Sequence, residues 1–137
     1  MKAVYPSRFL KFALIADAAV SGAVAALQLA APDGLSQFLL LPRSLLIETG
    51  IFLVAYTVLL VVLARSSVVW TALIGLVVIG NASWAAGCVA ALVSGLLLPN
   101  MFGTAFVMVQ AVAVLVFAVL EFRGLNASTP ARDAVRA

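Results

Sequence analysis

Six polar side chains with the chemistry to bind a ligand or relay a proton lie inside long apolar stretches of this sequence. They are Asp17, Gln28, Glu48, Tyr56, Asn81 and Gln110. Ionisable groups at membrane depth are costly, and they usually face a protein interior or a water-filled cavity where they serve ions, protons or ligands. We therefore predict that these six side chains line a ligand or proton path inside a bundle of helices.

The two acids, Asp17 and Glu48, carry most of this prediction. The Lys and Arg residues lie at the ends of the apolar stretches, so no buried basic residue is expected to neutralise them. A charge at mid-depth costs at least about 2.5–3.5 kcal/mol on insertion scales. We expect both acids to face the bundle interior and at least one to be protonated at neutral pH. The alternative for Glu48 is an outward position near Arg43, because its predicted depth is shallow.

The neutral polar residues have a plainer interpretation. Interhelical hydrogen bonds of amides such as Asn81, Gln110 and Gln28 hold many membrane bundles together, at about 0.6 kcal/mol each on average. We favour that role for the three amides. A further acid, Glu121, is interpreted as a solvated interface charge beside Arg123.

Four apolar stretches must position these side chains. They are predicted to be transmembrane helices over residues 9–30, 43–65, 69–98 and 101–122, since a span needs about 20 apolar residues. Residues 35–42 are too few to span and are predicted to form a short interfacial helix capped by Asp33. The predicted fold is all-α: a four-transmembrane-helix bundle in up-down-up-down order. Residues 1–125 would form this single domain, and residues 126–137 a disordered cytoplasmic tail.

Composition agrees with a membrane protein. Hydrophobic residues make up 66% of the 137-residue chain, charged residues 9%, and the mean hydropathy is +1.25. Soluble domains contain about 25% charged residues. The basic start and first apolar stretch resemble a signal peptide, but Asp17 within that stretch argues for a retained helix.

The residue inventory excludes several functions. There is one cysteine, Cys88, and no histidine, so disulfides within the chain, CxxC redox chemistry and His-bound metal or haem are not expected. No nucleophile–base pair is recognisable, and we expect no enzyme activity, catalytic residue, metal or cofactor. Nucleic acid is not an expected partner, because the few basic residues lie at the predicted helix ends.

Basic residues also predict an orientation. Of the eight Lys and Arg residues, all except Arg43 would lie on one side of the membrane. Positive residues favour the cytoplasmic side. Both termini should therefore be cytoplasmic in a plasma (inner) membrane protein.

Small residues at four-residue spacing predict which helices touch. Such residues let two helix backbones approach closely in lipid. The third stretch has Ser83, Gly87 and Gly95 in this register, and the first has Gly22. We predict that the first and third helices pack along these residues, so that Gly87→Leu would disrupt the bundle.

The layout resembles the DoxX-like group of small four-helix bacterial membrane proteins. The matching features are the short segment after the first helix, Leu41-Pro42 before the second, Glu48 with Gly50 early in it, and Arg65 at its far end. The chain departs from the group in lacking a basic residue late in the first helix. The resemblance implies a four-helix fold and a relation to membrane subunits or partners of redox systems.

Two classes of function follow. The first is binding or transport of a small or amphipathic molecule, such as a lipid, through the acid-lined interior. The second is a non-catalytic accessory subunit that assembles with a larger membrane protein. A chain of this size is small for a transporter acting alone, so we expect a homodimer or a larger membrane partner in addition to the bilayer.

Overall fold

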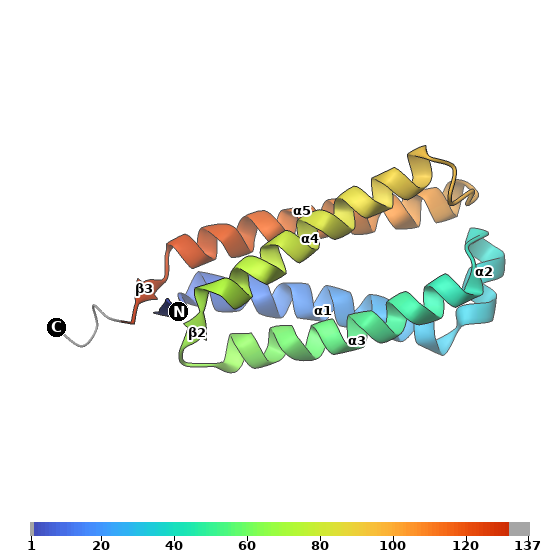
Figure 1. The fold of residues 1–137 in the computed structure, drawn as a ribbon. Helices are drawn as coiled ribbons and strands as arrows, with labels where there is room; N and C mark the ends of the chain where they lie inside the picture. Colours follow the sequence, from blue (N-terminus) through green and yellow to red (C-terminus); the bar gives the residue numbers. More distant parts are fainter. Residues whose placement is uncertain (1, 132–137) are drawn as a thin grey trace.

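The computed structural model describes residues 2–131, which form five helices and three short strands. The long helices are α1 (Arg8–Ala30), α3 (Arg43–Arg65), α4 (Thr71–Val93) and α5 (Met101–Asn126), and α2 (Pro32–Leu39) is short. Each long helix is long and apolar enough to cross a membrane, as expected for a multi-pass membrane protein. Figure 1 shows the four lying side by side along one direction.

Three strands gather at one end of the bundle, which we call the strand end. They are β1 (Ala3–Tyr5), β2 (Val69–Trp70) and β3 (Thr129–Pro130), in the order β2-β1-β3. Both pairings are antiparallel, with Ala3 opposite Trp70 and Tyr5 opposite Thr129. The sheet joins both ends of the described chain to the α3–α4 connection (Figure 1).

This sheet differs from the sequence prediction. Residues 69–70 pair as β2, so α4 begins two residues later than predicted, and it ends at Val93. Gly95, with a positive φ of 73°, follows that end as a turn residue. In the predicted tail, α5 continues to Asn126 and Thr129–Pro130 pair with β1, whereas residues 132–137 lie outside the described residues.

Local chemistry explains where the helices begin. The Ser7 hydroxyl accepts a hydrogen bond from the Leu10 amide at 3.0 Å, which caps α1. The Asn100 side chain accepts one from the Gly103 amide at 2.8 Å, which caps α5. The predicted capping role of Asp33 is wrong: α2 begins at Pro32, which suits a first helical position because it has no N–H to leave unpaired.

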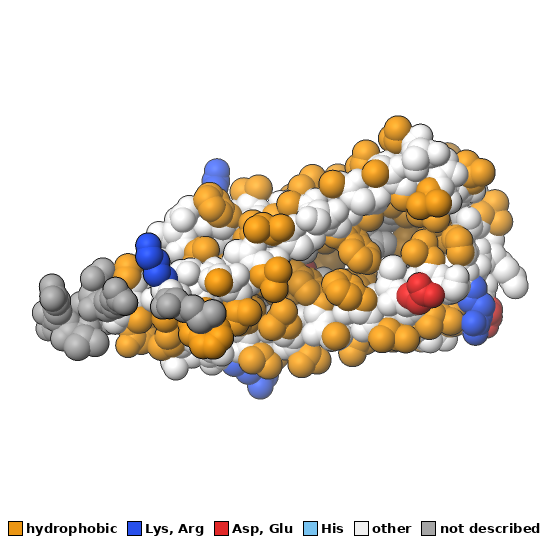
Figure 2. All heavy atoms as spheres, viewed as in Figure 1, with side chains coloured by type: hydrophobic (Ala, Val, Ile, Leu, Met, Phe, Trp, Pro, Cys, Tyr) orange, Lys and Arg blue, Asp and Glu red, His pale blue; other side chains and the backbone are white. Residues whose placement is uncertain are grey.

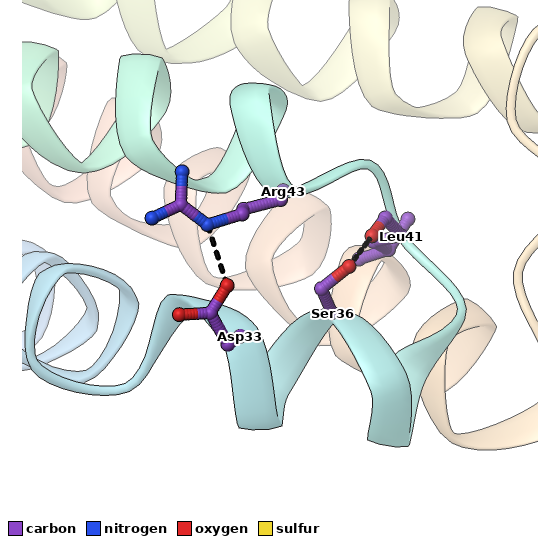
Figure 3. Close-up of polar contacts among 4 residues, drawn as sticks. All are labelled: Asp33, Ser36, Leu41 and Arg43. Carbon is purple, nitrogen blue, oxygen red and sulfur yellow. Dashed lines mark hydrogen bonds and ion pairs between the residues drawn. The ribbon is translucent and has the colours of Figure 1, made fainter.

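The opposite end of the bundle, the α2 end, is closed by the short helix. Ser36 donates a hydrogen bond to the Leu41 carbonyl at 2.6 Å, and Arg43 pairs with Asp33 (Figure 3). Asn100 then donates to the Phe38 carbonyl at 2.7 Å, which ties α2 to the start of α5. These contacts hold α2 across the ends of α3 and α5.

Helix pairing divides the bundle into two halves. α1 packs mainly on α3, and α4 packs mainly on α5, while α1 and α5 join the halves. α1 and α4 do not pack closely over their described lengths, so the predicted packing of the first and third helices along their small residues is wrong. Figure 1 shows the two halves separating toward the α2 end.

Candidate functional site

A cluster of buried polar side chains crosses the centre of the bundle. Asp17 Oδ2 accepts hydrogen bonds from the Tyr56 hydroxyl at 2.9 Å and from Asn81 Nδ2 at 2.9 Å. Asp17 Oδ1 accepts a third bond from the Ser21 hydroxyl at 2.8 Å. The Tyr56 hydroxyl also lies 3.0 Å from Asn81 Oδ1. Three donors therefore converge on one carboxyl group that is 0% exposed.

Glu121 completes this cluster from α5. Its Oε2 accepts a hydrogen bond from Asn81 Nδ2 at 3.2 Å, so one amide nitrogen bridges two carboxyl groups. Glu121 is 0% exposed, and its Oε1 has no hydrogen-bond partner among the described residues. We call Asp17, Tyr56, Asn81 and Glu121 the acid cluster; each long helix supplies one member.

The acid cluster lacks a compensating cation. Within residues 2–131 the one ion pair is that of Arg43 and Asp33, far along the chain from Asp17 and Glu121 and on exposed side chains. Burying two like charges side by side is unfavourable, so such a pair holds at least one proton or binds a cation. No group of acids, cysteines and histidines suited to a metal ion occurs in the described part of the chain.

A cavity of about 410 Å³ lies between the two halves toward the α2 end. We call it the large cavity. Its wall is mostly carbon and includes Leu46, Phe106 and Val107. The polar groups at this wall include Gln28, whose Oε1 accepts a hydrogen bond from Thr49 at 3.2 Å. This volume falls within the range of about 300–1,000 Å³ of small-molecule sites.

The large cavity is open sideways, between α3 and α4. These helices do not pack backbone against backbone along their described lengths. They are bridged by side chains: the Phe52 ring stacks on Trp84 with centroids 5.6 Å apart, and Tyr56 contacts Asn81. Figure 2 shows the surface hollowed between α4 and α3.

A small cavity of about 80 Å³ lies between the large cavity and the acid cluster. Asp17, Tyr56 and Asn81 line the small cavity. Both cavities share three lining residues: Gly80, Trp84 and Gln110. The arrangement therefore places an apolar chamber beside a buried carboxyl pair, with Trp84 at the junction.

The structure places the predicted site residues in three different environments. Asp17, Tyr56 and Asn81 meet in one cluster, and Gln28 and Gln110 line the large cavity. The prediction that Glu48 faces the interior is wrong, because that residue is exposed. α3 buries Leu46 and Gly50, and Glu48, two residues from each, lies about 200° around the helix from both.

The predicted packing residues also differ from expectation. Gly22 approaches Thr57 of α3, where an added Cβ would lie 3.3 Å from Thr57 Cγ2. Ser83 and Gly87 line the large cavity, and a Cβ on Gly87 would meet no atom within 4 Å. Gly95 is the turn residue after α4. The small residues of α4 thus provide space for the cavity in place of a close helix contact.

Glu121 was misinterpreted from the sequence as a solvated charge. Its proximity to Arg123 suggested the membrane surface, but α5 continues to Asn126 and buries Glu121 with Gly124 on one face. Gly124 was the available signal: it lies three residues from Glu121 on the same helix face, and a small residue there allows close approach of another helix. An added Cβ there would lie 2.7 Å from Leu10 Cα.

We compared the chain with protein-family models, curated proteins and solved structures, and none of them matches it.

Proposed function

We propose that this protein binds or carries a small amphipathic molecule that enters the large cavity sideways from the bilayer. The observation that carries the proposal is the open, carbon-lined cavity of about 410 Å³ adjoining a buried acid cluster. A purely structural set of hydrogen bonds would not need an adjoining chamber. No nucleophile with a positioned base lies in this wall, so binding or transport fits better than catalysis.

The proposed membrane arrangement follows from the helices and the basic residues. The long helices α1, α3, α4 and α5 cross the plasma membrane in up-down-up-down order, and α2 lies at the outer interface. Both termini are cytoplasmic in this arrangement, because Arg8, Arg65 and Arg123 lie at the ends near the strand end. Labelling from outside tests it: a cysteine at Asn100 reacts and one at Ser67 does not.

The natural thiol gives a direct test of the cavity. Cys88 is the only cysteine of the chain, is half-buried, and lines the large cavity. Its reaction with N-ethylmaleimide in phosphatidylcholine nanodiscs should slow when 1-decanol fills the cavity. Gly87→Leu should also slow it, because the added side chain occupies the same space.

The matched control is Gly75→Leu, the same substitution on the same helix. Gly75 lines neither cavity, and an added Cβ there meets no atom within 4 Å. It should leave both the labelling rate and the protection by decanol unchanged. Labelling of Cys88 that is indifferent to decanol would refute the binding function.

The second candidate is an accessory subunit, to which the resemblance to DoxX-like proteins points. The opening between α3 and α4 favours it as well, since a partner helix would fit there. The native mass in detergent separates the two candidates. A fixed stoichiometric partner supports the subunit, and a monomer or homodimer that co-purifies with a small molecule supports the binding protein.

A further inference from the structure

We infer that the ligand of this site is an amphipathic amine. Its apolar body would fill the large cavity, and its ammonium group would lie at the small cavity beside Asp17. This inference rests on the proposed function and adds the chemical class of the ligand. It stands on the charge, the aromatic side chains and the dimensions of the two cavities.

Charge is the first argument. Asp17 and Glu121 are both 0% exposed, and Asp17 lines the small cavity. If one proton is held between the two carboxyl groups, one negative charge remains buried. Three donors already stabilise it at Asp17, but none of them is cationic. A single ammonium group would neutralise this remaining charge.

The lining residues argue against other ligand classes. Neither cavity has a Lys or Arg among its described lining residues. An anionic head group would face the acid cluster without a counter-charge. A neutral head group would find the Gln28 and Gln110 amides but would leave the carboxyl charge unpaired.

Aromatic side chains strengthen the preference for a cation. Trp84 lines both cavities, and Phe52 and Tyr56 line the small one. The rings form a continuous stack, with centroids 5.6 Å apart for Phe52–Trp84 and 6.2 Å apart for Phe52–Tyr56. Ring faces attract ammonium groups within about 6 Å, and Trp does so most strongly. A cation at the junction would thus lie near aromatic rings as well as the Asp17 carboxyl group.

The dimensions divide the ligand into two parts. The small cavity, at about 80 Å³, has room for roughly two to three water molecules at about 30 Å³ each. A primary or small methylated ammonium group fits this space, whereas a bulky polar head group does not. The large cavity is about five times larger and takes the apolar body.

Three compounds with the same tail test the inference. Decylamine is a cation at neutral pH, since alkyl amines titrate near pH 10, whereas 1-decanol is neutral and decanoate is an anion. Binding is followed in phosphatidylcholine nanodiscs by the emission of Trp84, with Trp70→Phe removing the other tryptophan of the chain. We expect decylamine to bind about 10- to 100-fold more tightly than decanol, the range of a charge-assisted hydrogen bond. Decanoate should bind most weakly.

Two variants locate the effect at the acid cluster. Asp17→Asn should bring the decylamine-to-decanol ratio close to one, and Asp17→Ser serves if the first variant does not fold. Gly80→Leu should also reduce the ratio, because Gly80 lines both cavities and a leucine there separates them. Gly75→Leu, away from both cavities, should keep the full ratio.

The outcomes separate the inference from the function beneath it. Tight decanol or decanoate binding without a preference for decylamine overturns the amine inference and leaves the binding function standing. A decylamine preference that survives Asp17→Asn overturns the inference too, because the charge would then lie elsewhere. Trp84 emission that responds to none of the three compounds overturns both.

Discussion

At the strand end, α1 and α5 approach so closely that Gly124 leaves no room for a Cβ atom, whereas toward the α2 end α3 and α4 separate around a cavity of about 410 Å³. The strand end buries Leu10, Leu14 and Leu60 completely and adds a three-stranded sheet. The α2 end is held by hydrogen bonds of α2 to its neighbours and by a smaller apolar cluster that includes Leu39, Leu46 and Val107. One end of the bundle is thus fixed and the other is open.

This difference shows how a small membrane bundle can hold a cavity and still fold. Lipid removes the hydrophobic drive between helices, so close packing supplies the stability. Close contacts between other helices, such as those of Gly124 with Leu10 and of Gly103 with Leu39, allow the small residues of α4 to leave space instead of filling it. The acid cluster lies where the two kinds of packing meet.

The largest effect is expected for Gly124→Ala. The new Cβ would lie 2.7 Å from Leu10 Cα and 2.9 Å from Leu10 Cβ, and Leu10 is 0% exposed in the core. Neither α1, which carries Leu10, nor α5, which carries Gly124, can move without disturbing the sheet. We therefore expect a loss of about 1–3 kcal/mol in the free energy of unfolding. Thermal unfolding in detergent measures it. Gly75→Ala is the control and should stabilise α4 by about 0.4–1 kcal/mol.

Gly103→Ala tests the α2 end and should cost somewhat less. The added Cβ would clash with the Leu39 carbonyl oxygen and lie 2.6 Å from Pro99 Cβ. α2 is peripheral and can shift, so we expect about 1–2 kcal/mol. The shift should also loosen that end of the large cavity and speed the labelling of Cys88 by N-ethylmaleimide. A variant as unstable as Gly124→Ala would show that both ends are equally fixed.

Glu121→Gln should have a smaller effect, in the stabilising direction. It removes one of two adjoining buried acids and gives the position an amide donor that can face Asp17. The gain should be about 0.5–1.5 kcal/mol, the net value of one hydrogen bond. Thermal unfolding is again the measurement, with Glu48→Gln as the exposed control. A large loss of stability would mean that the acid is needed for packing.

The smallest effect is expected for Gly87→Leu. The sequence alone predicts disruption here, but the structure places Gly87 beside empty space. We expect the free energy of unfolding, measured in detergent, to stay within about 0.5 kcal/mol of that of the natural chain. This is the usual range for substitutions away from packed features. A marked loss would mean that the cavity closes in the membrane and that α4 packs there after all.

These cases show what was predictable from the sequence. The apolar stretches predicted the long helices well, and the bounds of α3 agree at both ends. The common depth of Asp17 and Tyr56 could be estimated by counting residues from opposite helix ends, and the two do form a hydrogen bond. Such counting needs only helix length and direction.

The rest depended on which face of each helix points inward. In these helices apolar residues cover every face, so periodicity does not distinguish lipid from protein. Glu48 was misplaced for this reason, and the partner of α1 was predicted to be α4 instead of α3. The strands were missed because β2 and β3 have only two residues each and depend on contacts between distant parts of the chain.

The distribution of the acid cluster over all four long helices has a consequence for biosynthesis. Asp17 enters the membrane with the first helix, before Tyr56, Asn81 and Glu121 have been made. Until then a lone acid in lipid costs about 2.5–3.5 kcal/mol or must take up a proton. A nascent chain halted before α5 retains Asp17 and Asn81 without Glu121 and without the helix that carries Gly124. The insertion machinery therefore has to retain α1, or tolerate it protonated, until α3 and α4 have supplied the Tyr56 and Asn81 donors.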